Sequence, residues 1–203
     1  MNRPTLILAS ASPRRADLLS WAGVDFEIRP VDLDESPRPG EAPAEQATRL
    51  AREKALAGDD HGPRLALGAD TIVVLEDLVI GKPSGPAEAR SHLAALSGRT
   101  HQVITAFCLV RAGQLLASQA VSSLVTFRPL TRTMIEGYAA TGEGLDKAGA
   151  YGLQGRGWAL IENVRGSLTN VMGLPLTEVL AALDQIAPGG PAADGFPLTL
   201  VLK

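Results

Sequence analysis

Cysteine is nearly absent from this sequence, because Cys108 is the only one in 203 residues. A lone cysteine has no partner, so the chain forms no internal disulfide. Cys108 lies in the apolar stretch ITAFCLV, with no evident activating base or helix N-terminus beside it. Such settings are what lower the pKa of a thiol. We therefore expect a buried, structural thiol rather than a reactive one.

Aromatic residues are also scarce, at 4% of the chain. The core must therefore be built mainly from Leu, Val, Ile and Ala, a composition that suits a β-sheet covered by helices. No stretch approaches the ~20 apolar residues that span a bilayer, and the first residues lack the basic start and apolar run of a signal peptide. We expect a cytoplasmic protein that does not bind a membrane.

The sequence has no excess of basic residues, since its formal net charge at pH 7 is −3. Proteins that grip a nucleic-acid polymer along a broad face neutralise its phosphates with many basic residues. The charge argues against such a polymer as partner and leaves room for a small basic pocket. With 45% hydrophobic and 20% charged residues, the composition is that of an ordinary globular protein. We expect one domain over residues 1–187 and a Pro/Gly-rich tail over residues 188–203.

Short apolar strands alternate with helical stretches along the chain. Strands are predicted near residues 5–9, 26–31, 64–80 (two strands), 102–110, 115–127 and 158–164. Helices are predicted near residues 13–21, 44–57, 86–96, 131–140 and 175–186. Ser12 in the capping position and Pro13 in the first turn mark the start of the first helix. The alternation of helices with hairpins and non-local strands predicts an α/β fold with a mixed sheet.

The turn before the first predicted helix gathers groups that bind anions. Ser10, Ser12, Arg14 and Arg15 stand where the backbone N–H groups of a helix N-terminus are free. Arginines at this end oppose the helix dipole at a cost of ~0.3–1 kcal/mol each. A phosphate ligand would explain why two arginines stand there despite this cost. The alternative is a capped surface helix with two solvated arginines.

Two lysines offer further positive charge. Lys54 falls on the apolar side of its predicted helix, together with Ala47, Leu50 and Ala51. Lys82 follows a predicted strand in the turn GKP, which leaves its ammonium projecting. Both lysines suit a phosphate pocket. The alternatives are that Lys54 snorkels outward along its methylene stem and that Lys82 is an ordinary turn residue.

A carboxylate, Asp70, interrupts the apolar strand LALGADTIVVL. Buried carboxylates persist when they are paired, hydrogen bonded or bound to a metal. Glu35, in the acidic segment DLDES, offers a second carboxylate. Two carboxylates beside a triphosphate are the usual setting for Mg²⁺. The alternatives are that Asp70 bonds a neighbouring turn and that Glu35 belongs to a solvated charge run.

Six motifs, taken in order, resemble the Maf family over roughly residues 5–185: SASPRR, DES followed by RLAREKA, GADT, GKP, DKAGAYGLQG and GSLTNVMGLPL. The resemblance implies a twisted mixed β-sheet flanked by helices, with two lobes around a nucleotide cleft. It also implies a homodimer that cleaves the α–β phosphoanhydride of a nucleoside triphosphate with a divalent cation, Mg²⁺ or Mn²⁺. One departure concerns local packing: the family often has Tyr-Val before RLA, where this chain has Gln46-Ala47.

The same resemblance implies roles for individual residues. Asp70 corresponds to the proton acceptor of the family, and Glu35 to a metal or water contact. The remaining correspondences are phosphate contacts at Ser10, Arg14, Arg15, Lys54 and Lys82, and positions linked with substrate choice at Arg14, Thr71 and Gln154.

The base preference turns on Gln154, in a glycine-rich loop over residues 149–157. A glutamine amide offers both a donor and an acceptor, which suits the O4 and N3–H edge of uracil and thymine. The related subgroup that resembles 7-methyl-GTP pyrophosphatases carries Glu there, so this chain resembles the dTTP/UTP subgroup, with modified pyrimidine nucleotides included. The alternatives are a 7-methyl-GTP or an inosine/xanthosine triphosphate pyrophosphatase, a non-hydrolytic nucleotide-binding regulator of septum formation, and a Gln154 that only braces its own loop.

Overall fold

The computed structural model describes residues 6–186 of the chain. The predicted tail, residues 188–203, and its predicted lack of contacts lie outside the described residues. The helices are α1 (Pro13–Trp21), α2 (Pro43–Gly58), α3 (Pro86–Leu96), α4 (Arg132–Ala140), α5 (Leu168–Val171) and α6 (Leu176–Ile186). The strands are β1 (Leu6–Leu8), β2 (Phe26–Ile28), β3 (Ala66–Leu75), β4 (Leu78–Ile80), β5 (Thr100–Arg111), β6 (Gln114–Phe127) and β7 (Ile161–Arg165).

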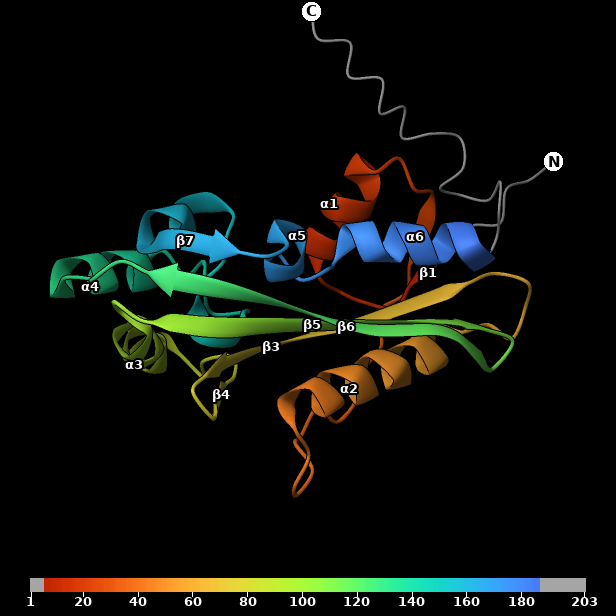
Figure 1. Cartoon of the computed structure of the whole chain (residues 1–203), viewed down its shortest axis with the longest axis horizontal. Coiled ribbons are helices and arrows are strands. Elements are labelled where there is room, and N and C mark those ends of the chain that lie inside the picture. The colour runs from red at the N-terminus through yellow and green to blue at the C-terminus, as the bar shows by residue number, and fades with distance from the viewer. Residues whose placement is uncertain (1–5, 187–203) are drawn as a thin grey trace, which may run out of the picture.

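These strands form one seven-stranded sheet in the order β2-β1-β3-β5-β6-β7, with β4 paired to β3 beside that path. Strand β1 pairs in parallel with β2 and β3, whereas β3, β5, β6 and β7 pair antiparallel along the chain of neighbours. The prediction of a mixed sheet is therefore confirmed. Figure 1 shows the long strands β3, β5 and β6 running through the length of the molecule.

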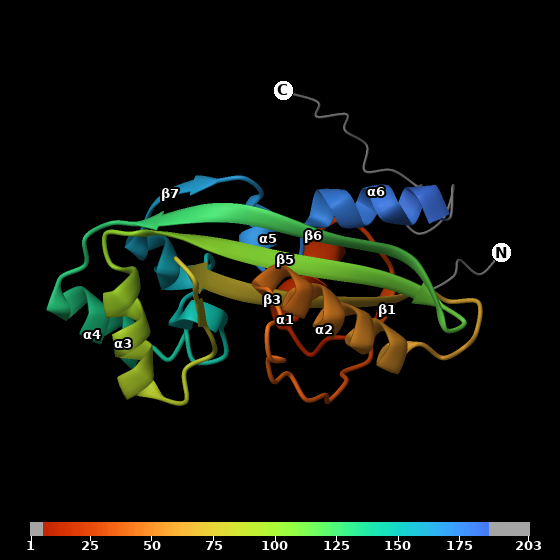
Figure 2. The ribbon, with the colours of Figure 1, turned by 60° about the horizontal axis from the view of Figure 1, so that its bottom comes forward.

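Helices cover both faces of the sheet (Figures 1 and 2). At one end, α2 lies against one face while α1 and α6 lie against the other. Helices α3 and α4 lie at the opposite end, near β7. The molecule therefore has two lobes that share the long central strands, as the resemblance implies.

Side chains along β3 alternate between the two faces, as a pleated strand requires. Leu67 and Ala69 pack in the cluster beneath α1 and α6, and Val73 packs in the cluster of the other lobe. Ile72 and Val74 face the opposite side, where they pack with alanines of α2. Adjacent residues of β3 therefore serve different layers of the molecule.

Helix α2 lies unusually close to β3 because the residues between them are small. Ala47, Ala51 and Ala55 are fully buried against the sheet. A Cβ atom added to Gly68 would come within 2.2 Å of the Ala51 carbonyl oxygen and 2.4 Å of the Ala55 amide nitrogen. Only glycine permits this approach, which brings the α2 backbone onto β3 beside Asp70.

Cys108 is buried on the α2 side of β5. Its Sγ lies 3.2 Å from Ser118 Oγ. Burial raises the pKa of the thiol above its ordinary value, against an opposing effect of the hydrogen bond with Ser118. The prediction of a structural thiol is confirmed.

The structure corrects several predicted local features. Ser12 stands at the N-cap of α1, but its side chain makes no capping hydrogen bond; its backbone N–H donates to Ser10 Oγ at 3.2 Å. The predicted strand over residues 158–164 begins only at Ile161, because Gly155–Leu160 forms a 3₁₀ helix. A Cβ on Gly157 would lie 1.8 Å from the Gly152 carbonyl oxygen, so the loop closes too tightly there for an extended strand. The predicted turn RGSLTN contains the short helix α5, capped by the side chain of Ser167.

Candidate functional site

An unpaired stretch in one edge of β3 marks the site. Strand β1 pairs with Ala66 and Leu67, and β4 pairs with residues 73–75. Between them, residues 68–72 have no strand partner on this edge within the described chain. A cavity of about 720 Å³ opens here, where the two lobes meet, and we call it the β3 cavity. Cavities of this size suit a small-molecule ligand.

The structure brings every predicted site residue to this one cavity. Its lining includes Ser10, Arg14, Arg15, Glu35, Lys54, Asp70, Thr71, Lys82 and Gln154. They come from parts of the chain separated widely in the sequence, namely the turn before α1, α1 itself, the acidic loop, α2, β3, the turn after β4 and the glycine-rich loop. Their separation in the sequence conceals this proximity, and the fold places them together.

Charges of opposite sign alternate along one wall of the cavity. Lys54 Nζ lies 2.7 Å from Asp70 Oδ1 and 2.5 Å from Glu35 Oε1. Lys82 Nζ lies 3.2 Å from Glu35 Oε2. Lys54 is buried, so it does not snorkel into solvent. A buried carboxylate and a buried ammonium each satisfy the other, which is the condition for keeping either charge inside a protein.

Glu35 is the more exposed of the two carboxylates, with 42% of its side chain accessible. Burial acts to raise its pKa, but hydrogen bonds and positive charges from Lys54 and Lys82 outweigh that effect and leave the pKa below its ordinary value. Glu35 is therefore ionised near neutral pH and is held by two lysines rather than freely solvated.

The two carboxylates fit a divalent cation. Asp70 and Glu35 each place an oxygen on the Lys54 ammonium, so the two carboxylates lie near each other with that ammonium between them. Within residues 6–186 no cluster of three or more His, Cys, Asp or Glu side chains suits a metal. Mg²⁺ is commonly bound by one or two carboxylates, with phosphate oxygens and water as its other ligands. The carboxylates of Asp70 and Glu35 therefore suit a cation that is bound together with the phosphates of a ligand.

Arg15 is buried at the base of α1 rather than solvated. Its Nε donates to the Gly173 carbonyl oxygen at 2.8 Å, its Nη1 to Ser10 Oγ at 2.9 Å and its Nη2 to Thr71 Oγ1 at 3.3 Å. Burial lowers the pKa of Arg15, and the negative charge of Asp70 opposes that effect. A guanidinium has five N–H donors and stays protonated in proteins, so donors remain for an anion in the cavity.

Arg14 joins α1 to the segment that leads into the glycine-rich loop. Its Nη1 lies 2.9 Å from Asp146 Oδ2, and the arginine side chain is 22% exposed. Burial acts to raise the pKa of Asp146, but Lys147 and Arg14 together lower it below its ordinary value. The ion pair therefore persists at neutral pH and fixes the first turn of α1 against the segment that leads into the loop carrying Gln154.

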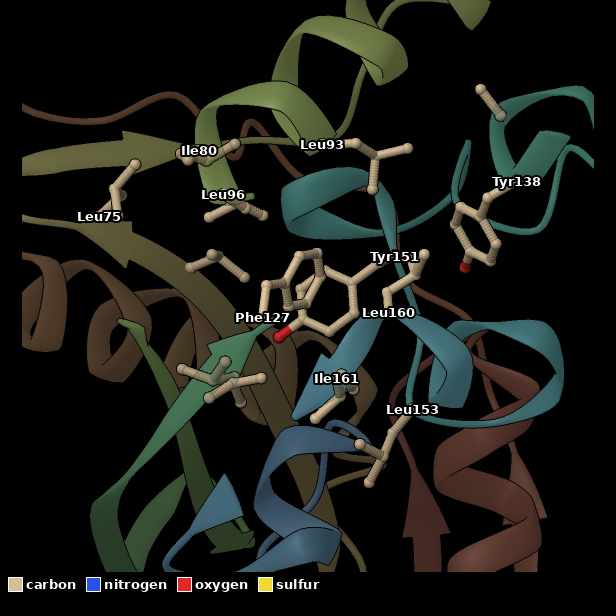
Figure 3. Close-up of a cluster of buried hydrophobic side chains, with 14 residues drawn as sticks. Leu75, Ile80, Leu93, Leu96, Phe127, Tyr138, Tyr151, Leu153, Leu160 and Ile161 are labelled. Atoms are coloured by element: carbon tan, nitrogen blue, oxygen red, sulfur yellow. The ribbon is translucent and has the colours of Figure 1, made fainter. Parts of the chain in front are cut away.

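The glycine-rich loop is anchored on three sides. Tyr138 Oη accepts a hydrogen bond from Gly152 N at 3.2 Å, and Glu143 Oε2 accepts one from Arg156 N at 2.9 Å. Tyr151 Oη lies 2.7 Å from His101 Nε2. Figure 3 shows the Tyr151 ring beside Phe127 in the cluster of buried side chains.

Gln154 is left with hydrogen-bonding capacity to spare on this rigid loop. Its Oε1 is buried and has no partner among the described residues. The side chain makes none of the backbone hydrogen bonds that bracing its own loop would require within residues 6–186. An unsatisfied buried carbonyl costs stability, so this position is not explained by packing within the loop alone.

Four polar residues near the site were not predicted from the sequence: Thr105, Asn170, His101 and Tyr151. Thr105 and Asn170 are fully buried and hydrogen bonded to each other beneath Thr71. The signal that identified Asp70, a polar residue inside an apolar strand, is also present at Thr105 in VITAFCLV. It is weaker there because threonine is common in strands.

No helix within residues 6–186 combines the length and the apolar character needed to cross a membrane.

The chain is similar to known proteins over the whole of its described length. The model of the family described as Maf-like protein matches residues 5–186. A protein of Anaeromyxobacter dehalogenans named dTTP/UTP pyrophosphatase is 48% identical over 200 residues, which cover 96% of each chain. One of Geobacter sulfurreducens with the same name is 47% identical over 188 residues, covering 92% of this chain and 98% of that protein. Among solved structures, a HAM1 protein from Coxiella burnetii aligns at 18% identity and a TM-score of 0.45, over 90% of this chain and 96% of that one.

Proposed function

The chain belongs to the Maf family, and on that premise we propose that it is a nucleoside triphosphate pyrophosphatase that hydrolyses dTTP and UTP to the monophosphate and pyrophosphate. The observation that carries the proposal is the Asp70–Lys54 pair, buried in the wall of a cavity lined by further arginines and lysines. The relatives named dTTP/UTP pyrophosphatase support the same activity and substrate class.

Asp70 is the base in this proposal. It takes a proton from a water molecule whose oxygen attacks a phosphorus of the α–β bridge, and the bridging P–O bond breaks to release pyrophosphate. Lys54, 2.7 Å from Asp70 Oδ1, holds the carboxylate in a fixed orientation. Most of the rate in such reactions comes from positioning and charge stabilisation, so no covalent intermediate with the protein is needed.

Positive side chains hold the triphosphate. Arg15 keeps N–H donors beyond those used for Ser10, Thr71 and Gly173, and it is fixed by those contacts. Lys82 supplies a more exposed charge at the mouth of the site. A rigid guanidinium suits a phosphate with two donors at once, whereas an ammonium acts as a point charge.

A divalent cation, Mg²⁺ or Mn²⁺, is part of the proposal, with Asp70 and Glu35 as the residues that would hold it. When bound, such a cation supplies charge neutralisation to the phosphate oxygens. Lys54 contacts both carboxylates, so it balances their charge from the protein side and sets their separation.

Gln154 is the proposed reader of the base. Its Oε1 has no hydrogen-bond partner within residues 6–186. In the proposal, the N3–H group of uracil or thymine donates to this oxygen. A purine triphosphate specificity remains the competing enzyme hypothesis. A non-hydrolytic regulator would need the phosphate contacts but has no use for the carboxylate of Asp70 beside them.

A homodimer in the cytoplasm completes the proposal. The dimer follows from the family resemblance, and light scattering of the purified chain tests it.

A panel of nucleoside triphosphates, scored for pyrophosphate release, tests the proposed activity. We expect UTP and dTTP to give the highest kcat/KM. Asp70→Asn should abolish hydrolysis while nucleotide affinity stays within about an order of magnitude, because the change removes the base and keeps its shape. Turnover of Asp70→Asn at the rate of the unsubstituted enzyme would refute the assignment of the base.

A further inference from the structure

Strand β6 forms an open edge of the sheet along residues 114–123, which we call the β6 edge. On one side the strand pairs with β5 along its length, and on the other side β7 pairs only with residues 124–127. Figure 2 shows β6 along the border of the sheet, with β7 beside one of its ends. No loop or helix among residues 6–186 makes a backbone hydrogen bond to the β6 edge. In an antiparallel strand every second residue points its N–H and C=O groups away from the partner strand, so the β6 edge presents such groups outward.

The β6 edge is exposed and carries no charge. Its sequence, QLLASQAVSS, contains no Asp, Glu, Lys, Arg or Pro. Leu115 and Leu116 are 43% and 36% exposed, and Gln119 and Ala120 are exposed near the middle of the edge. A long, exposed and uncharged edge strand is a surface to which another strand adds readily.

The other edges of the sheet carry features that prevent such pairing, namely charged side chains and short strands. On β2, Glu27 accepts hydrogen bonds from Arg29 Nη2 at 2.9 Å and from Arg64 Nη1 at 2.5 Å. On β7, Glu162 and Arg165 are exposed, and β4 is only three residues long. The longer, uncharged β6 edge differs from all three, so it is the edge of this sheet that suits a partner strand.

The absence of charge favours a second copy of this chain as the partner. When a strand pairs antiparallel with its own copy about a two-fold axis, the side chains near the axis face themselves. Like charges that face each other across a strand pair are destabilising, so a self-pairing strand must be uncharged, whereas a different protein allows charges of opposite sign. The Gln119 amide carries both a donor and an acceptor, so it can bond with its own copy. The composition of the β6 edge therefore matches a contact between identical surfaces.

Pairing through the β6 edge leaves the candidate site of each copy open. Strand β5 lies between β6 and β3 in the sheet, and residues 114–123 do not line the β3 cavity. The edge is therefore a surface separate from the site described above.

We propose that two copies of this chain associate by antiparallel pairing of their β6 edges, which joins their sheets into one continuous sheet. The inference rests on the homodimer given under the proposed function and adds the surface that forms it.

Charge substitutions in the middle of the β6 edge test this interface. Gln119→Lys/Ala120→Lys places like charges opposite each other on both faces of the paired strands, so we expect the dissociation constant of the dimer to rise about 5- to 30-fold. Light scattering over a dilution series measures it. Gln119→Glu/Ala120→Glu should weaken the dimer similarly, and an equal mixture of the two variants should restore it, because opposite charges then face each other. The control Ala94→Lys/Ala95→Lys adds the same charge at exposed positions of α3 and should leave the dissociation constant unchanged.

A dimer that both charged variants leave intact overturns the inference, because the contact then lies elsewhere. An unsubstituted chain that is a monomer at every concentration measured overturns the inference together with the proposed dimer. If circular dichroism shows that the charged variants do not fold, crosslinking decides instead. A short bismaleimide should join two Gln119→Cys chains and not two Ala94→Cys chains, and equal crosslinking of both, or of neither, overturns the inference. Pyrophosphate release from UTP is measured on the same samples, so a failure of the interface is distinguished from a failure of the proposed activity.

Discussion

Adding a single methyl group to Gly68 should disturb both the stability and the activity of this protein. The added Cβ would meet the Ala51 carbonyl oxygen at 2.2 Å and the Ala55 amide nitrogen at 2.4 Å. Ordinary van der Waals contact for such a pair begins near 3.4 Å, and both atoms belong to the backbone of α2. The clash therefore has no flexible side chain to absorb it, so the helix must move away from β3 by about 1 Å.

The displacement acts on the site because Lys54 lies in the turn of α2 between the two contacted residues. Overpacking of a core costs about 1–3 kcal/mol. For a chain of this length, each kcal/mol lowers Tm by about 2–4 °C, so Gly68→Ala should melt roughly 2–12 °C lower. A misplacement of about 1 Å at a catalytic group costs up to ~100-fold in rate. We expect kcat for UTP to fall by about 10- to 100-fold as Lys54 withdraws from Asp70.

Differential scanning calorimetry and steady-state kinetics measure the two effects. Gly137→Ala is the matched control, since nothing lies within 4 Å of a Cβ at Gly137. It lies inside α4, where alanine is favoured over glycine by ~1 kcal/mol, so its Tm should rise slightly and its kcat should not change. A Gly68→Ala enzyme with unaltered Tm and kcat would refute the account of how α2 positions Lys54.

Three further predictions concern the base, the pH dependence and the metal. Gln154→Glu should lower kcat/KM for UTP and dTTP by ~5- to 150-fold and that for 7-methyl-GTP less or not at all; an unchanged ratio of pyrimidine to purine substrates would remove Gln154 from base selection. Burial lowers the pKa of His101 from 6.5 to about 4, so protonation favours the unfolded chain. Its contribution to stability is complete above pH 6.5 and is lost as the pH falls towards 4, by up to about 3 kcal/mol. Urea titrations from pH 7 to pH 4 on the unsubstituted protein and His101→Gln measure this loss, and parallel curves would contradict it. Excess EDTA should abolish UTP hydrolysis and added Mg²⁺ or Mn²⁺ restore it, whereas full activity in EDTA would contradict the roles given to Asp70 and Glu35.

The order of helices and strands was predictable because apolar periodicity and turn residues mark them in the sequence. The helices around Lys54 and at residues 86–96 follow their predicted bounds closely. The strand predicted over residues 158–164 starts too early because the apolar residues from Trp158 onward suggested a buried strand. In the structure Trp158 is 52% exposed, and the glycines before it close a 3₁₀ turn that local pattern does not reveal.

Single residues of the candidate site were predictable where a charged or polar residue stands in an apolar stretch of sequence. Asp70 in an apolar strand and Lys54 on an apolar helix face are such residues, and the structure pairs them. The partnership of Thr105 with Asn170 spans 65 residues, and each fits its local pattern well enough to pass unnoticed. Contacts of this kind depend on tertiary packing, which one sequence without its fold does not specify.

The products formed from UTP decide whether the enzyme cleaves the α–β bridge. The enzyme is incubated with UTP and Mg²⁺ in a reaction free of other phosphatases, and UMP, UDP, pyrophosphate and orthophosphate are quantified over time. Cleavage of the α–β bridge predicts UMP and pyrophosphate in equal amounts from the earliest time point. Formation of UDP and orthophosphate, or no product from UTP and dTTP, would contradict the account.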